Sequence, residues 1–518
     1  MKLKHSPLLA LFAILMLLLS ACGGAATPAA EAPTAAAPAA APAADAPTAA
    51  APAADAPTAA PAAEAATAAP AAEAPAPTAV MQFDQEPPAG AKVVTWMVRS
   101  GPDENRWEKE VVLPGWQKAH PDIFLKVLNI VQDDIAVKRE AIIAAKEPLD
   151  VWSPNWGGDG FGSDRTRGLL ADLTPLIERD KFDTSDYIPE IFKIYSGEGK
   201  QYGIPFLSTG TYLYYNMKLF DEAKIPYPPT SWDDKSWTWD KFISLAKQLT
   251  KNYDDPNTGV YGAGAGDLWP KFDAVPLIFG KDPWTKESLA TGFSGDINIT
   301  DDATINAYQK FHDLTYVDKV APDAATGQAL NQLGGEFQSG RVAMELAGGW
   351  GHWSYKSLIN DPNGFCWGAA PLPWGSPDAN IRATIFTDPW AITNGISPEQ
   401  TDLGWEFIKF LAAPEASKAY SDATGAPPTR KSLLDGYYKL YEKCMAPDKV
   451  KEVFTGAFTH GRESSNHLLV KYDELSSTWD NALGPFNSDP EGKAADVLPQ
   501  IQTDVNAALK RITEENKK

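Results

Sequence analysis

Cysteine and histidine are scarce in this chain, and basic residues are outnumbered by acidic ones. Among 518 residues there are 3 cysteines and 6 histidines, so we expect neither a disulfide scaffold nor a metal-cluster protein. Lys and Arg number 46 against 67 Asp and Glu, a net charge of −21. An acidic surface repels phosphate backbones and anionic lipids. We therefore expect no nucleic-acid partner and no direct binding to a lipid surface.

Long apolar runs are also absent. The run at residues 8–19 follows Lys2 and Lys4 and is shorter than the roughly 18 residues that span a bilayer, which is typical of a secretory signal. It leads into LSAC at 19–22, which resembles the bacterial lipoprotein box. The resemblance implies removal of residues 1–21, lipidation of Cys22 and an extracytoplasmic protein anchored to the cell membrane. An ordinary secretory signal is the alternative.

The segment after the signal has almost no core-forming residues. Residues 27–79 contain only Ala, Pro, Thr, Asp and Glu, which cannot bury a core, and the prolines interrupt any alanine helix. We interpret residues 22–89 as a lipidated cysteine followed by a disordered tether. The remainder holds all 17 Trp and exceeds the 250–300 residues or so that one core supports, so we expect at least two lobes.

Strand-like and helix-like segments alternate after the tether. Apolar and β-branched runs predict strands, and apolar residues at helical spacing predict helices: strands at 92–98, 123–127 and 149–152, helices at 107–118 and 135–146. This alternation predicts an α/β fold with a largely parallel, doubly wound sheet. Loops beyond the carboxyl ends of such strands face the ligand crevice, here 100–105 and 153–161.

Six short sequence blocks follow one another along the chain: LLADLTPL at 169–176, GKQYGIP at 199–205, LYYNMKLF at 213–220, SWTWD at 236–240, FQSGRVAM at 337–344 and PPTR at 427–430. Their order and spacing, over about residues 92–509, resemble the extracellular solute-binding proteins of bacterial sugar ABC importers, the maltose-binding type. The resemblance implies a two-lobed periplasmic-binding-protein-like fold with crossing hinge segments and a ligand cleft. Lobe 1 would comprise 90–205 and 370–428, and lobe 2 would comprise 206–369 and 429–518, with crossings near Pro205 and 367–373.

The same resemblance implies a function. The protein would not be an enzyme but a receptor that captures a sugar, an oligosaccharide in our interpretation, and delivers it to the permease subunits of an ABC importer. It implies no cofactor and no metal. We expect a monomer that touches the membrane only through its lipid anchor.

Sugars present a hydroxyl rim and an apolar face, so their sites combine flat aromatic rings with polar side chains. Glycines at 348, 349 and 351 flank Trp350. The resemblance places Trp350, Trp269 and Trp390 at the family's cleft, with Asp267 as an acid near Trp269. Asp103 and Glu104 follow the predicted strand at 92–98, and Asn155 and Trp156 follow the one at 149–152. The candidate ligand-binding residues are Trp350, Trp269, Trp390, Trp156, Asn155, Asp103, Glu104 and Asp267. For each tryptophan, burial in a core is the alternative.

Three other functions stay open. A secreted glycoside hydrolase needs two carboxylates beside the scissile bond, which Asp103, Glu104, Asp267 and Asp388 could supply, although no nucleophile elbow, HExxH helix or P-loop is present. The ligand could instead be a polyamine, a peptide or a glycerol phosphate. An adhesin or sensory receptor without a transporter is the third. Pairing of Cys366 with Cys444 is also open, because sequence does not give their distance.

Overall fold

The fold is organised by one large mixed sheet, with one large hydrophobic cluster in the first part of the molecule and two in the second. A computed structural model describes residues 85–156 and 159–517, which lie within one compact unit, 75–518. The predicted signal peptide, the lipidation of Cys22 and the tether as far as residue 84 lie outside the described residues. Within the described ranges, none of the helices combines the length and apolarity that a membrane span requires.

The sheet is mixed rather than parallel. Its strand order is β2-β1-β3-β9-β6-β7, with β10 on β9 and β8 on β6. The strand bounds are β1 Lys92–Ser100, β2 Ile123–Val131, β3 Val151–Trp152, β4 Ser196–Gly197, β5 Lys200–Gln201, β6 Ile204–Asn216, β7 Met344–Gly348, β8 Trp367–Ala370, β9 Ala383–Ile392 and β10 Gly461–Glu463. Strands β1, β2 and β3 are parallel as predicted, whereas β9 runs antiparallel to β3 and β6. The prediction of a largely parallel sheet is therefore wrong for the strands after β3, except that β10 pairs with β9 in parallel.

Helices cover both ends of the sheet. In the first part of the chain they are α2 Pro102–Trp107, a π-helix η1 Glu108–Val112, α3 Leu113–Ala119, α4 Ile135–Ala145, α5 Phe161–Thr166, α6 Thr174–Asp180 and α7 Pro189–Phe192, with 3-10 turns η2 Gln132–Asp134 and η3 Lys193–Tyr195. Then come α8 Met217–Ala223, α9 Trp239–Leu249, α10 Lys271–Ile278, α11 Lys286–Thr291, α12 Asp302–Tyr316, α13 Ala324–Asn331 and α14 Gly351–Asn360. The last are α15 Pro398–Ala412, α16 Pro414–Thr424, α17 Lys431–Tyr438, η4 Lys439–Tyr441, α18 Pro447–Thr459, α19 Ser465–Leu468, α20 Tyr472–Ser488 and α21 Ala494–Asn516.

One predicted loop is a helix. Residues 100–105 are predicted to form a loop, but α2 begins at Pro102 and carries Asp103 and Glu104 in its first turn. Proline suits the first position of a helix, where its missing N–H costs nothing, and acids there complement the helix dipole. These local signals outweigh the loop composition.

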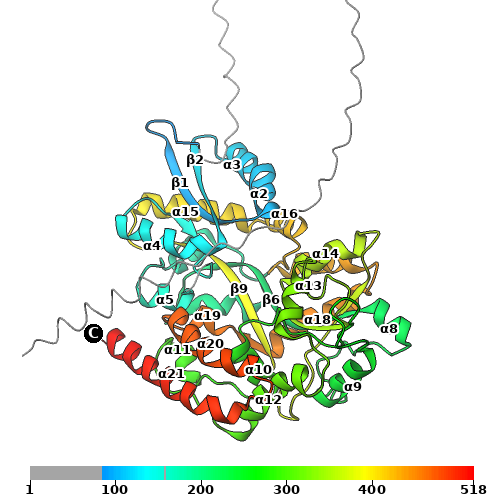
Figure 1. The fold of residues 1–518 in the computed structure, drawn as a ribbon. Coiled ribbons are helices and arrows are strands. Elements are labelled where there is room, and N and C mark those ends of the chain that lie inside the picture. Colours follow the sequence, from blue (N-terminus) through cyan, green and yellow to red (C-terminus); the bar gives the residue numbers. More distant parts are fainter. Residues whose placement is uncertain (1–84, 157–158, 518) are drawn as a thin grey trace, which may run out of the picture. The chain divides into compact units, whose positions relative to one another are not determined.

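Strands β6 and β9 pass from one hydrophobic core to the other. The first core takes Leu207 from β6 and Trp390 from β9, whereas Tyr212 of β6 and Ala383 of β9 pack in the second part of the molecule. In Figure 1 both strands lie between the end that carries β1, β2 and α15 and the end that carries α9, α12 and α18. The two lobes are thus joined by strands that serve both, which makes a hinge possible at their centre.

The lobe limits themselves stay a prediction. Ala370 and Leu372 pack with Leu213 of β6 in another cluster of the second part, and this favours a second crossing inside β9 rather than at 367–373. We use "first lobe" below for the part around the cluster that holds Trp390, and "second lobe" for the part around the two clusters that hold Ala370 and Tyr212.

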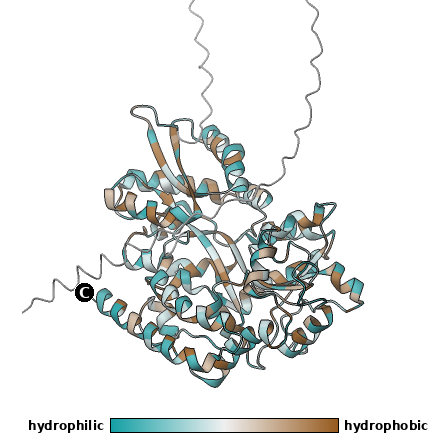
Figure 2. Cartoon of the chain, in the orientation of Figure 1, coloured by the Kyte–Doolittle hydropathy of each residue, from teal (hydrophilic) through white to brown (hydrophobic). Residues whose placement is uncertain are grey.

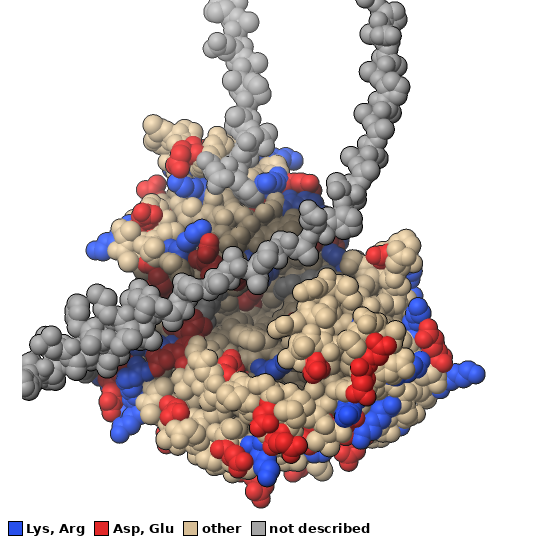
Figure 3. All heavy atoms as spheres, in the orientation of Figure 1, with Lys and Arg blue, Asp and Glu red and all other residues tan. Residues whose placement is uncertain are grey.

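Hydropathy and charge follow the fold. In Figure 2 the helices change between hydrophobic and hydrophilic along their length, as expected for elements with one buried face. In Figure 3 acidic and basic side chains are mixed on both lobes over the visible face. The net negative charge is therefore spread on that face and does not form a patch of one sign there.

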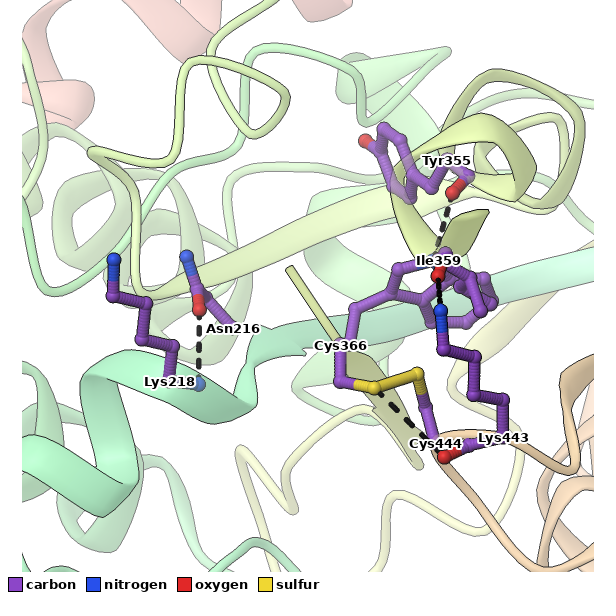
Figure 4. The surroundings of a disulfide bond; sticks show 8 residues. Asn216, Lys218, Tyr355, Ile359, Cys366, Lys443 and Cys444 are labelled. Atoms are coloured by element: carbon purple, nitrogen blue, oxygen red, sulfur yellow. Dashed lines mark hydrogen bonds between the residues drawn. A yellow bond between two sulfur atoms is a disulfide. The ribbon is translucent and has the colours of Figure 1, made fainter. Parts of the chain in front are cut away.

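The two described cysteines form a disulfide. Cys366, just before β8, is bonded to Cys444, 78 residues later in the chain (Figure 4). Beside it, Lys443 donates to the carbonyl oxygen of Ile359 at the end of α14. The bond links β8 to the turn before α18 within the second lobe, and it answers the pairing question that the sequence left open.

Candidate ligand-binding cavity

A cavity of about 700 Å³ lies where the two lobes meet. Its size falls within the range of about 300–1,000 Å³ that is usual for small-molecule sites. It is lined by Arg99, Gln132, Asp133, Ala136, Val137, Asn155 and Trp156 from the first lobe, by Leu207, Thr209, Phe386 and Asp388 from the crossing strands, and by Trp269, Trp350, Asn466, His467, Tyr472 and Asp473 from the second lobe.

Aromatic rings form most of the second-lobe wall. The Trp269 ring is 44% exposed and lies 6.0 Å from Phe386 and 6.1 Å from Tyr472, measured between ring centroids. Trp350 packs edge-on against Phe386 at 5.0 Å. These four rings form a continuous apolar surface, which suits the flat C–H face of a sugar.

The glycines before Trp350 are required by close approach. A Cβ added to Gly348 would lie 2.1 Å from the Trp350 ring, and one added to Gly349 would lie 1.5 Å from Oγ1 of Thr209. Both contacts are far inside van der Waals distance. The glycine pair therefore lets the indole fold back over its own strand and close against the crossing strand β6.

Hydrogen bonds hold the first-lobe wall in place. Asn155 donates from Nδ2 to the carbonyl oxygen of Thr387 (2.6 Å) and to Tyr195 Oη (2.7 Å), and its Oδ1 accepts the Phe161 N–H (3.1 Å). Trp156 donates from Nε1 to Asp388 Oδ2 at 3.0 Å. The loop that carries Asn155 and Trp156 is thus tied to β9 and cannot shift independently of it.

A buried polar chain continues from this loop to the other side of the cavity. The Thr387 N–H donates to Oε1 of Glu463 (3.2 Å), and the same oxygen is hydrogen-bonded to Nδ1 of His467. Burial raises the pKa of Glu463, and the bond with His467 opposes that rise. Asn155 and His467, which line opposite sides, are therefore connected through Thr387 of β9 and Glu463 of β10.

Charged groups in the cavity are mostly acidic. Arg99 lies over the Trp156 ring at 5.5 Å and forms an ion pair with Glu104 at 2.6 Å. Asp388 and Asp473 face the cavity from β9 and α20, and burial together with the neighbouring Asp159 raises the pKa of Asp473. The lining therefore offers hydrogen-bond acceptors for hydroxyl groups.

Four of the eight predicted residues line the cavity: Trp350, Trp269, Trp156 and Asn155. Their contact with a ligand stays a prediction. All four come from loops next to strands or helices, where the sequence analysis expected them.

The other four lie behind or beside the wall. Trp390 is 1% exposed and stacks on Phe206 at 4.1 Å, with its edge toward Trp156 at 5.4 Å. Glu104 holds Arg99 in place, while Asp103 pairs with Arg106 at 2.9 Å on the outer surface of α2.

Asp267 is the fourth of these. It accepts a side-chain hydrogen bond from Trp350, and burial raises its pKa. It thereby holds the indole from behind, away from the main cavity.

Several residues that line the cavity were not predicted from the sequence. Phe386 and Asp388 share one face of β9 with Trp390, so the alternation of a strand could have identified them once Trp390 was chosen. His467 and Tyr472 come from a segment about 80 residues further on. Nothing in their local pattern indicates a cavity, because only the return of the chain to β9 through β10 brings them there.

Metal binding has no candidate in the described ranges: no group of three or more His, Cys, Asp or Glu is arranged to hold an ion.

Comparison with known proteins supports a common fold and family. The Arabinooligosaccharide-binding protein of Bacillus subtilis (strain 168) is 30% identical over 372 residues, covering 70% of this chain and 77% of the relative. The Galactooligosaccharide-binding protein of the same organism is 26% identical over 285 residues, covering 54% and 60%. The ABC substrate-binding protein Lmo0181 of Listeria monocytogenes, solved in complex with cycloalternan, superposes with a TM-score of 0.64 over 81% of this chain and 99% of its own, at 21% identity.

The solved structure, at that identity, establishes the two-lobed fold alone. Residues 116–446, well over half of the chain, match one protein family along their whole length. The chain belongs to the bacterial extracellular solute-binding protein family.

Proposed function

We propose that this protein captures an oligosaccharide in the cavity between its lobes and delivers it to the permease subunits of an ABC importer. The observation that carries the proposal is the aromatic surface of the cavity, with Trp156 on the first lobe and Trp269, Trp350 and Tyr472 on the second. Rings on both sides suit a ligand with two apolar faces, as a pyranose has. Relatives named for arabino- and galactooligosaccharides support the same class.

Ligand capture would proceed by a shift of population. A sugar that contacts Trp156 and Trp350 together binds the closed arrangement better than an open one, and its binding energy favours closure. Strands β6 and β9, which serve both cores, are the segments that would bend. The closed form would then dock on the permease.

The polar residues would have distinct roles. Asp388 would offer carboxylate oxygens and Asn155 its amide group to the ligand. Asn155 already makes three hydrogen bonds within the protein. Asp267, Glu104 and Trp390 would act indirectly, by holding Trp350, Arg99 and Trp156.

Membership in an extracellular family places the protein outside the cytoplasm. We extend this to a lipid anchor at Cys22, a tether over 22–89 and a monomeric receptor, with lobe limits as predicted except for a second crossing in β9. We also propose that the protein is not an enzyme, in keeping with relatives that are named as binding proteins.

A titration of the purified full chain tests this function. The panel contains neutral mono- and oligosaccharides, including arabinose and galactose oligomers, with spermidine and glycerol 3-phosphate as ligands of the alternative classes. Tryptophan fluorescence reports binding, because Trp156, Trp269 and Trp350 line the cavity, and chromatography of the recovered sugar reports turnover. Ligand at 100 times its Kd should also stabilise the fold by about 2.7 kcal/mol.

We expect saturable binding of at least one oligosaccharide, recovered intact. Cleaved sugar would show a glycoside hydrolase and overturn the receptor proposal. Binding of spermidine or glycerol 3-phosphate with no sugar would retain the receptor but replace its ligand class.

A further inference from the structure

A second, smaller chamber of about 270 Å³ lies on the other side of Trp350. Trp350 lines both the chamber and the main cavity, so its indole is the partition between them. The chamber is lined by Gly266, Asp267, Asn331, Gly335, Glu336, Phe337, Gln338, Glu345, Trp350, Ser354 and Tyr355. Three of these residues are acids and three are aromatic, and none is basic.

One of the acids has a free oxygen. Glu345, the second residue of β7, is 1% exposed, and its Oε1 accepts the Asp267 N–H at 3.2 Å. Its Oε2 is buried and has no hydrogen-bond partner among the described residues. A buried carboxylate oxygen without a partner is costly unless something satisfies it. Glu345 lines the chamber, so a partner held in the chamber can contact this residue.

Glycines make room for the acids. A Cβ added to Gly264 would lie 2.1 Å from Oε2 of Glu345, and one added to Gly266 would lie 2.7 Å from the Glu336 carboxylate. Any other residue at these two positions would push the carboxylates away. The loop at 262–266 therefore has small residues where the acids need space.

The charge in the chamber is unbalanced. Lys271 is the basic residue that acts on all three carboxylates, of Asp267, Glu336 and Glu345, and it does not line the chamber. Burial, followed by the negative neighbours, raises the pKa of Glu345 well above its ordinary value. A cation in the chamber would remove this penalty and favour the ionised acids.

Aromatic faces complete the wall. Phe337 and Tyr355 pack with ring centroids 4.7 Å apart, and Trp350 lies across the chamber mouth. Aromatic faces attract organic ammonium groups, which carry a spread positive charge and apolar hydrogens. Carboxylates combined with rings suit such a group better than they suit a strongly hydrated inorganic ion.

We propose that the chamber behind Trp350 binds an ammonium group, with Glu345 as its principal acceptor. The inference rests on the proposed function only in taking the main cavity as the sugar site. The ammonium group could belong to an amino-sugar unit of the captured oligosaccharide or to a separate small amine. The chemistry at Glu345 is the same for both.

Calorimetric titration of the full chain tests the proposal, with methylammonium chloride as the free amine. A matched pair of sugars, the disaccharide of glucosamine and its N-acetylated form, tests an attached amine, because acetylation removes the charge. The key variant is Glu345→Gln. Its control is Glu108→Gln, another fully buried glutamate with an unpartnered oxygen, which lies in the first lobe and lines neither space. Glu336→Gln is a second chamber variant in case Glu345→Gln fails to fold.

We expect the Kd for an amine to rise at least tenfold in Glu345→Gln and to change less than twofold in Glu108→Gln. Dependence on Glu345 for methylammonium alone identifies a separate amine, whereas a preference for the glucosamine disaccharide that is lost in the variant identifies an amino sugar. Equal binding of both amines to the native chain and the Glu345→Gln variant overturns the proposal. So does calcium chloride that binds in a Glu345-dependent way while neither amine binds. The neutral oligosaccharide panel tests the receptor function separately, so the two failures are distinguishable.

Discussion

The two walls of the cavity are built differently. On the first lobe, Asn155 and Trp156 are tied by hydrogen bonds to β9, and Arg99 is paired with Glu104. On the second lobe, Trp269 is 44% exposed, and Trp350 has a chamber behind it. The first wall thus behaves as a preorganised frame, while the second offers the exposed ring of Trp269 as a recognition surface.

Two buried glutamates extend this contrast. Glu108 in the first lobe and Glu345 in the second each have one oxygen without a hydrogen-bond partner. Glu345 lines the chamber behind Trp350, whereas Glu108 is fully buried and lines neither that chamber nor the main cavity. An unpartnered carboxylate beside a cavity therefore suggests a bound ligand. One that lies away from any cavity lowers the stability of the fold instead.

The largest expected effect comes from removing the covalent link of the second lobe. Replacing Cys366 and Cys444 together by serine opens a loop of 78 residues, and chain entropy then predicts a loss of about 4 kcal/mol in unfolding free energy. Urea unfolding with and without a reducing agent measures it. The reductant should destabilise the native chain and leave the double variant unchanged, and equal stability of the two proteins would contradict the prediction.

The buried acid of the first lobe should make stability depend on pH. Burial raises the pKa of Glu108 from 4.5 to about 9, with the Asn129 hydrogen bond opposing it. The folded chain then keeps a proton that the unfolded chain loses between these values, so stability falls as pH rises through this window.

The variant Glu108→Gln should not lose stability in this way, because glutamine carries no titrating proton. From pH 5 to pH 7 the native chain should lose about 2–3 kcal/mol more stability than the variant, at about 1.4 kcal/mol for each pH unit. Urea unfolding at the two pH values measures the difference. Parallel pH profiles for the two proteins would show that Glu108 is ionised in the folded state.

Two asparagines on opposite walls should differ in their effect on folding. Asn155→Ala leaves the Phe161 N–H without its partner and removes one of the two side-chain hydrogen bonds to the Thr387 carbonyl, which should cost about 1–3 kcal/mol. Asn466→Ala removes a side chain whose Oδ1 is itself unpartnered, so its cost should be smaller. Denaturant unfolding of both variants measures the difference, and a larger cost for Asn466→Ala would reverse the assignment of frame and recognition surface.

The smallest expected change in free energy concerns the ligand. Trp350→Ala should weaken oligosaccharide binding tenfold or more, about 1.4 kcal/mol, because the ring is shared by the cavity and the chamber. Fluorescence from the remaining tryptophans or calorimetry gives the Kd, and a thermal scan shows that the variant is folded. Trp350→Phe keeps a ring and should retain most of the affinity. An unchanged Kd in Trp350→Ala would remove this residue from the site.

Much of the local structure followed from the sequence. The alternation of apolar runs predicted β1, β2, β3 and the helix α4, since such patterns depend on neighbours along the chain. The ordered blocks predicted the two-lobed fold and the family. Glycines around Trp350 pointed to a ring on a loop. In these cases a residue and its immediate neighbours carry the information.

Only the tertiary structure decided which of the candidate rings line the cavity. Phe386, Asp388 and Trp390 share one face of β9, yet Trp156 covers Trp390 and leaves the first two in the cavity. The disulfide, the second-lobe wall from 466–473 and the chamber at Glu345 likewise depend on segments far apart in sequence. Periodicity fixes the side on which a residue leaves its strand or helix, but what covers that side is set by chain segments that local patterns do not place.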